Sequence, residues 1–177
     1  IFGRVERIEA YNNSVGFLNE SDASENRMMT YIQIGNATGL ETISSYCFIN
    51  CRNLRSIFSY ADGSPPKETL PDSIRWFGQS AFAGCSSLAN LDWIKKSIRS
   101  IGDNCFADCT SLTSITGLND TSLVYIPSGC FSNCTSLASI RDSLSTNVTD
   151  IGDYAFAYCQ SLESIEGVPS TIMTIGE

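Results

Sequence analysis

The eight cysteines are the residues of this chain best suited to chemistry, because thiolates bind metals, form disulfides and act as nucleophiles. An even number allows a disulfide framework. The C-x-x-x-C pairs allow a zinc site, but the chain has no histidine and lacks the usual C-x-x-C spacing. One column of the repeat described below holds Cys51, Cys85, Cys109, Cys134 and Cys159. A second column holds Cys47, Cys105 and Cys130, and there Ala81 and Ala155 replace cysteine. A position that accepts alanine or cysteine is small, buried and apolar, so we expect free, buried thiols and no metal or other cofactor.

We recognise no catalytic motif in the sequence. Without histidine the commonest general base is missing, and there is no phosphate-binding Gly-Lys-Ser/Thr loop or nucleophile elbow. The carboxylates lack the dense spacing of a calcium loop, so they are read as solvated turn acids. A hydrolase with paired carboxylates stays open, although a thin repeat core offers no obvious closed pocket for raising a carboxyl pKa. We therefore expect no enzyme.

Sequence repeats must position these residues. The segment Ile98–Ile115 has the frame I-x-x-I-G-x-x-C-F-x-x-C-x-x-L-x-x-I, which recurs at intervals of roughly 24 to 25 residues, with one interval about ten longer. Its Ile-x-x-Ile and Leu-x-x-Ile pieces are rich in β-branched residues, and stacked copies predict parallel strands. The piece from Asp103 to Ser111 predicts a short helical or 3-10 turn that packs Phe106 inward. The glycine after Ile-x-x-Ile indicates either a positive φ or a close backbone approach.

The chain divides into two parts. Residues 1–39 hold degenerate N-terminal repeats, and residues 40–177 hold regular repeats with an insertion at 59–72. The insertion lies on a binding face or is a tolerated surface loop. A further unit begins with Ile172-x-x-Ile175-Gly176 as the chain stops. We therefore expect a fragment of a longer solenoid.

This frame resembles the BspA-type leucine-rich repeat family, whose members occur on bacterial surfaces and in some protozoa. The resemblance implies an α/β repeat fold: a β-rich leucine-rich-repeat solenoid with stacked parallel strands and short helical or 3-10 turns. It also implies an extracellular or cell-surface location and a role in adhesion or protein binding. The family shares no catalytic residues.

The candidate binding surface follows from the period of two in a strand. If the Ile of Leu-x-x-Ile faces the core, its neighbours face outward. The residue before it is mostly serine, whereas the residue after it varies in charge and size, as a recognition face would. Tyr31, Phe58 and Tyr60 are expected to cluster, with Trp93 one repeat further on; alternatively, Phe58 tucks under the insertion. The expected binding residues on this concave face are Tyr31, Gln33, Phe58, Tyr60, Asp92, Thr116, Arg141 and Glu166.

The net charge of −8 argues against nucleic acid and against anionic membrane surfaces as partners. No apolar run approaches the roughly 18 to 20 residues of a membrane span, so direct membrane insertion is not expected. The Asn-x-Ser/Thr sequons would be glycan sites in a eukaryotic secreted protein and turn residues in a bacterial one. They begin at Asn12, Asn19, Asn36, Asn119, Asn133 and Asn147. The sequence predicts a non-catalytic module that binds a protein or glycan; the alternative is a structural spacer or assembly component of a larger surface protein or particle.

Overall fold

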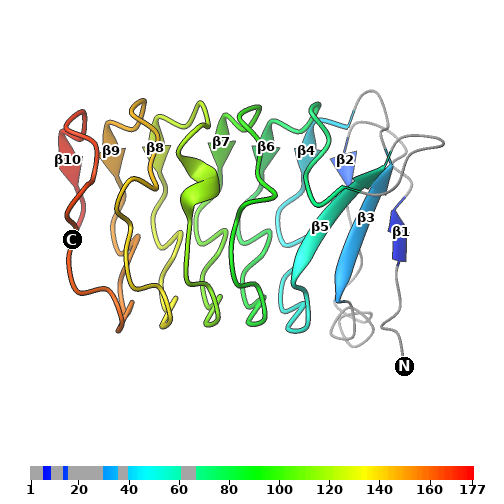
Figure 1. The fold of residues 1–177 in the computed structure, drawn as a ribbon, viewed down its shortest axis with the longest axis horizontal. Helices are drawn as coiled ribbons and strands as arrows, with labels where there is room; N and C mark the ends of the chain where they lie inside the picture. Colours follow the sequence, from blue (N-terminus) through cyan, green and yellow to red (C-terminus); the bar gives the residue numbers. More distant parts are fainter. Residues whose placement is uncertain (1–5, 9–13, 16–29, 36–39, 61–66) are drawn as a thin grey trace.

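The computed structural model describes residues 6–8, 14–15, 30–35, 40–60 and 67–177. It shows successive coils of the chain stacked side by side between the N-terminal and C-terminal ends (Figure 1). The strands in the described residues are β1 (Glu6–Ile8), β2 (Ser14–Val15), β3 (Tyr31–Gly35), β4 (Thr42–Ile43), β5 (Ser56–Tyr60), β6 (Trp76–Phe77), β7 (Ser100–Ile101), β8 (Tyr125–Ile126), β9 (Asp150–Ile151) and β10 (Thr174–Ile175). A 3-10 helix, η2, spans Thr116–Leu118.

All strand pairs in the described residues are parallel, which confirms the predicted stacking. The Ile-x-x-Ile halves form a sheet of order β2-β4-β6-β7 and a sheet of order β8-β9-β10. Within them Phe77 pairs with Ile101 and is buried, whereas Trp76 pairs with Ser100 and both are exposed. This alternation places one column of side chains in the core and the next in solvent.

A proline separates these two sheets. Gly78 and Gly152 each donate their N–H to the carbonyl of the isoleucine in the preceding coil, Ile43 and Ile126, both at 2.8 Å. Pro127 occupies the same position in the coil of β8 and has no N–H to donate. The ladder therefore loses a hydrogen bond between β7 and β8.

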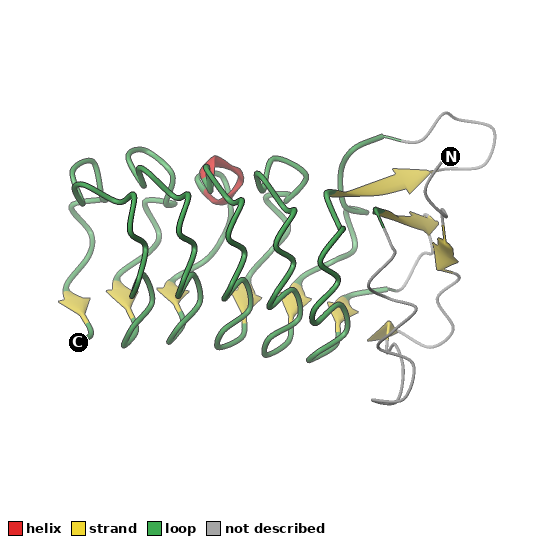
Figure 2. Cartoon of the chain, turned by 90° about the horizontal axis from the view of Figure 1, so that it is seen from below, coloured by secondary structure: helices red, strands yellow, loops and turns green. Residues whose placement is uncertain are grey.

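The Leu-x-x-Ile halves behave differently along the chain. Near the N-terminus they form the sheet β1-β3-β5, in which Ile32 and Ile34 keep a spacing of two and are both buried. In the coil of η2 the next buried residue comes three positions on, from Ile115 to Leu118. A spacing of three fits a 3-10 turn, and η2 forms there. In Figure 2 η2 and the long N-terminal strands lie on the side of the stack opposite the row of short strands.

The predicted helical or 3-10 turn at 103–111 is instead a run of tight turns. Asn104 and Asp108 adopt left-handed conformations with φ of 55° and 58°, which Asn and Asp tolerate well. The N–H of Phe106 donates to the carbonyl of Cys130 in the next coil at 2.9 Å, and the N–H of Ala107 donates within its own coil to Asn104 at 3.1 Å. This alternation continues from 104 to 109, so each N–H in the turn has a partner without forming a helix.

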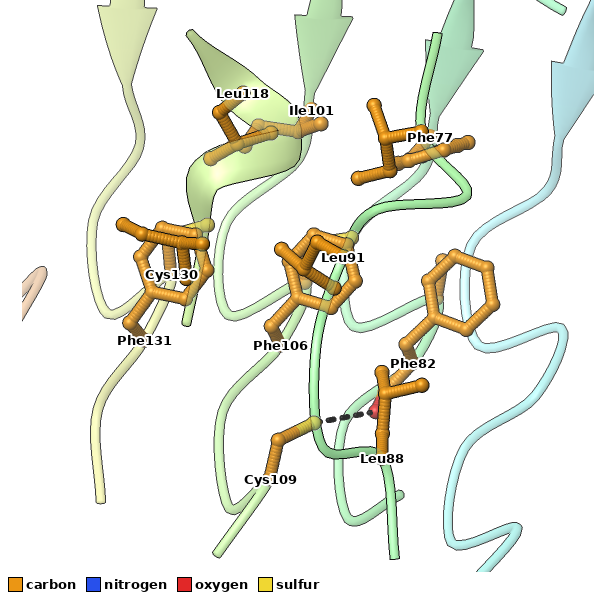
Figure 3. Close-up of a cluster of buried hydrophobic side chains, with 14 of the residues drawn as sticks. Phe77, Phe82, Leu88, Leu91, Ile101, Phe106, Cys109, Leu118, Cys130 and Phe131 are labelled. Atoms are coloured by element: carbon orange, nitrogen blue, oxygen red, sulfur yellow. Dashed lines mark hydrogen bonds between the residues drawn. The ribbon is translucent and has the colours of Figure 1, made fainter. Parts of the chain in front are cut away.

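Stacked phenylalanine rings run through the core. Phe106 is fully buried between Phe82 and Phe131, with ring centroids 5.4 and 5.6 Å apart and planes within 4° and 2° of parallel (Figure 3). Phe48 extends this stack at one end and Phe156 at the other. The predicted inward packing of Phe106 is confirmed.

All eight cysteines are buried, as predicted. The column that keeps cysteine throughout makes a recurring thiol contact across coils. Cys109 donates its Sγ hydrogen to the carbonyl of Phe82 in the preceding coil at 3.4 Å (Figure 3). Cys85, Cys134 and Cys159 make the same contact to Phe48, Phe106 and Phe131 at 3.2–3.3 Å. A thiol is a weak hydrogen-bond donor, and an alanine in this column could not make the contact.

The predicted exposure of Trp93 is wrong. Its side chain is fully buried, its ring packs 5.4 Å from that of Phe82, and its Nε1–H donates to the carbonyl of Asn90 at 3.2 Å. Trp93 lies in a turn two positions after the buried Leu91, where the alternation of a strand does not apply, and the turn brings its ring into the core.

The predicted insertion at 59–72 begins with an antiparallel bridge, in which Ser59 and Lys67 exchange N–H···O bonds of 2.8 Å. Residues 61–66 lie outside the described residues. At the far end Leu70 is fully buried, and its N–H donates to the carbonyl of Trp93 at 2.9 Å. This part of the segment therefore belongs to the core.

The glycines after Ile-x-x-Ile are explained by close backbone approach. A Cβ on Gly102 would lie 2.4 Å from the backbone N of Gln79, and one on Gly78 would lie 2.2 Å from that of Ser45. Neither glycine has a positive φ. The coils thus pack backbone against backbone along this column.

Gly102→Ala is expected to lower the free energy of unfolding by about 1–3 kcal/mol, because the added methyl group forces two coils apart. Ser44→Ala, at the same position in another coil, is the control and should change it by less than about 0.5 kcal/mol. Urea unfolding followed by circular dichroism measures both. Equal effects of the two substitutions would contradict the close packing.

Candidate functional site

Two of the predicted binding residues meet on the N-terminal sheet. Tyr31 in β3 and Phe58 in β5 are half-buried, and their rings contact edge to face with centroids 5.8 Å apart. Edge-to-face aromatic pairs contribute about 0.5–1.5 kcal/mol beyond their buried area. The pair is therefore held in place while part of each ring remains open to solvent.

Gln33 and Tyr60 are placed only through their backbone. Gln33 pairs with Phe58, and Tyr60 pairs with Gly35 in the parallel register of β3 and β5. Their side chains lie outside the described residues, so the predicted cluster is seen only for Tyr31 and Phe58.

Asp92 and Thr116 meet further along the stack. Both are exposed, and the Thr116 hydroxyl donates to Oδ1 of Asp92 at 3.1 Å. They line an open hollow of about 530 Å³ together with Lys95 and Asp72. Lys95 Nζ forms an ion pair with Asp72 Oδ1 at 2.8 Å. The hydrogen bond that Lys95 donates in this ion pair lowers the pKa of the Asp72 carboxyl.

Arg141 and Glu166 continue the same column on the last two coils, where both are exposed. The Arg141 side chain lies close over Gly167, where a Cβ would meet Arg141 Cγ at 2.6 Å. The eight predicted residues thus spread along the stack. They include one aromatic pair and one polar pair, and they do not converge on a single pocket.

Basic and acidic residues are concentrated in different parts of the chain, and the net charge alone does not show this. Residues 52–99 contain seven of the eleven basic residues and four of the nineteen acidic ones. Residues 100–177 contain nine acidic residues and one basic residue, Arg141. A partner therefore meets a basic middle section and an acidic C-terminal half.

The sequence analysis missed the outer face of the short-strand row, which we name the strand-ladder face. Its outward column contains Trp76, Ser100, Tyr125 and Asp150. Trp76 is 38% exposed and Tyr125 is 44% exposed. The same period-of-two argument, applied to Ile-x-x-Ile as well as to Leu-x-x-Ile, would have found it.

The carboxyl groups with shifted pKa values do not suit acid catalysis. Hydrogen bonds from Thr149 and Thr174 lower the pKa of Asp150, as Lys95 lowers that of Asp72. A general acid needs the opposite shift. In the part of the chain that the structure describes, no three His, Cys, Asp or Glu residues are grouped to hold a metal ion. No helix in that part is long and apolar enough to cross a membrane.

Comparison with known proteins identifies the repeat. Residues 20–62 and 57–177 match, in six copies, the family model described as the BspA type leucine rich repeat region. No curated protein matches the chain.

Three solved structures illustrate the likeness. A leucine-rich repeat protein from Bacteroides ovatus is 28% identical, with a TM-score of 0.67 over 98% of this chain and 48% of its own. A leucine rich cell surface protein from Faecalibacterium prausnitzii is 22% identical, with a TM-score of 0.69 over 99% of this chain and 44% of its own. A leucine-rich repeat protein from T. pallidum is 24% identical, with a TM-score of 0.52 over 83% of this chain and 73% of its own. The latter two show the fold alone, and the chain spans less than half the length of the first two.

Proposed function

The chain belongs to the BspA-type leucine-rich repeat family, and from that premise we propose that it is a non-catalytic module that binds a protein or glycan at a cell surface. The similar protein from Faecalibacterium prausnitzii is described as a cell surface protein, which supports this location. We further propose that the stacked coils form a solenoid, with adhesion or partner recognition as its role.

The contrast between constant and variable columns carries this proposal. Phe106, Cys109 and Leu112 are fully buried, and the same residue types recur at these positions in other coils. The outward column beside Leu-x-x-Ile instead changes from aromatic to acidic to basic residues. A scaffold needs constant core residues, whereas recognition uses variable exposed ones.

Tyr31 and Phe58 are the proposed anchors of this face. Aromatic residues that are rigid and partly exposed contribute much of the energy at protein interfaces. Their mutual contact holds both rings in one arrangement before binding, so less side-chain entropy is lost when a partner binds. Asp92, Thr116, Arg141 and Glu166 would then add specificity along the same side.

The Tyr31→Ala/Phe58→Ala double variant is expected to weaken partner binding at least tenfold, because it removes both anchors. The partner is first captured from a cell-surface or matrix extract with the wild-type chain. Its affinity for each variant is then measured by surface plasmon resonance. Circular dichroism must show that the double variant is folded.

The matched control is Tyr154→Ala/Tyr158→Ala, which removes two aromatic rings that are 61% and 75% exposed outside this column. It should bind as the wild type does. Equal losses in the two double variants would refute the proposed face.

A structural spacer or assembly component is the second candidate. The last coil leaves Ile165, Met173 and Ile175 more than half exposed, and Ile165 and Ile175 line an apolar hollow of about 290 Å³. A further repeat or another assembly component stacked there would bury them. Failure of the wild-type chain to capture any partner would favour this role.

A further inference from the structure

An open hollow of about 500 Å³ lies at the C-terminal end of the strand-ladder face, along β8, β9 and β10, which stand side by side in Figure 1. Its volume falls within the range of about 300–1,000 Å³ that is typical of ligand sites. Gly152 and Gly176 line it together with the hydroxyl residues Ser128 and Thr174. The hollow therefore joins side chains of three successive coils in one place.

The ring of Tyr125 lines this hollow and is 44% exposed. Its hydroxyl reaches the next coil, where a Cβ added to Gly152 would touch it. The ring therefore leans along the wall of the hollow toward β9, on which Asp150 is its partner in the strand register. An aromatic ring offers a large, rigid apolar surface. The C–H face of a sugar ring packs well on such a surface.

Two carboxylates line the same hollow, and hydrogen bonds hold both of them in place. Asp150 accepts the hydroxyl of Thr149 at 2.6 Å and also that of Thr174. Asp153 Oδ1 accepts the N–H of Glu177 at 3.3 Å. A carboxylate has about four lone-pair sites, so each keeps free acceptor sites after these bonds. The two groups are thus positioned to accept hydrogen bonds from a ligand.

The charge of the hollow limits the class of ligand. None of its lining residues is basic, and Arg141, the one basic residue in 100–177, lies over Gly167 instead. An anionic ligand would therefore be repelled. Hydroxyl groups suit the carboxylates, because hydrogen bonds to a charged acceptor are stronger than neutral ones. A lone ammonium group would use the carboxylates but leave the Tyr125 ring uncovered, whereas a sugar uses both.

We propose that Tyr125, Asp150 and Asp153 form a site for an uncharged hexose unit of a glycan. The C–H face of the sugar packs against the Tyr125 ring, and its hydroxyl groups donate to the two carboxylates. This inference rests on the proposed function as a binding module and names a neutral glycan as its ligand, but it uses a different face from Tyr31 and Phe58.

The test measures, by titration calorimetry, the binding of three neutral hexasaccharides: cellohexaose, maltohexaose and mannohexaose. We expect at least one of them to bind, and an oligogalacturonate of the same length to bind at least tenfold more weakly. Tyr125→Ala and Asp150→Ala/Asp153→Ala should each weaken binding of the neutral sugar at least tenfold. Tyr125→Phe keeps the ring and should stay within twofold of the wild type. Circular dichroism must show that each variant is folded.

The matched control is Tyr154→Ala/Tyr158→Ala, which removes two exposed tyrosines that do not line the hollow and should stay within twofold of the wild type. A loss equal to that of Tyr125→Ala would overturn the site in favour of general stickiness of exposed rings. Tighter binding of a lysine hexapeptide than of every hexasaccharide would overturn the sugar as its ligand, as would no binding of any hexasaccharide at millimolar concentration.

The Tyr31→Ala/Phe58→Ala variant separates this inference from the proposed function. It should bind the neutral hexasaccharide as the wild type does. If every hexasaccharide fails to bind while a captured partner still depends on Tyr31 and Phe58, only the sugar site is refuted. If neither ligand class binds, both the sugar site and the binding module are refuted.

Discussion

Replacing Phe106 with alanine is expected to lower the free energy of unfolding by about 3–5 kcal/mol. The ring is fully buried and stacks on both sides, against Phe82 and Phe131. Removing it leaves a cavity and breaks two aromatic contacts at once. Because each coil is stabilised by its neighbours, the loss should spread to adjacent repeats. Guanidinium unfolding gives the free energy, and hydrogen exchange of the amides in neighbouring coils shows the spread.

The control for this substitution is Phe156→Ala in the same column. Phe156 is only half-buried and stacks on Phe131. Phe156→Ala should therefore lower the free energy of unfolding clearly less than Phe106→Ala does. A change below about 1 kcal/mol for Phe106→Ala would mean that the stack does not hold the coils together.

Raising the pH above about 9 under reducing conditions is expected to destabilise the fold by several kcal/mol, because of the buried thiols. Burial raises the pKa of Cys85, Cys105, Cys109, Cys130, Cys134 and Cys159 above their usual value of 9.0. Above pH 9 the unfolded chain loses these protons while the folded chain keeps them. This contribution to stability is therefore complete well below pH 9 and falls as the pH rises through it, with a slope that approaches about 1.4 kcal/mol per pH unit for each thiol that stays protonated in the folded chain.

Urea unfolding between pH 7 and 10 measures this loss. Cys105→Ala is the matched variant, because Ala81 and Ala155 occupy the same column. It should make the decline with pH shallower by the contribution of one thiol, about 1.4 kcal/mol per pH unit. A flat profile between pH 7 and 10 in the wild type would show that the thiols are not held neutral by burial. In the folded chain at pH 8 these thiols should also resist alkylation.

Part of the candidate site could be read from the sequence. Tyr31 and Phe58 were placed on neighbouring strands because their repeats keep the common period, and the structure brings their rings into contact. The pairing of Asp92 with Thr116 follows from the same register. The exposure of Trp93 was predicted wrongly because the chain turns after Leu91, which brings the Trp93 ring into the core. The strand-ladder face was missed because only the Leu-x-x-Ile half of each repeat was treated as a surface.

The sequence alone predicts the repeat frame, the parallel stacking and the buried columns of Phe, Cys, Leu and Ile. These follow from a period, and a recurring period shows which side chains must leave water in every coil. The contacts between side chains of neighbouring coils become visible only in the structure. The structure pairs Trp76 with Ser100, divides one ladder into two sheets at Pro127, and packs Gly102 against the backbone of the preceding coil. Such contacts join residues far apart in the chain, so they depend on the register in which whole coils stack.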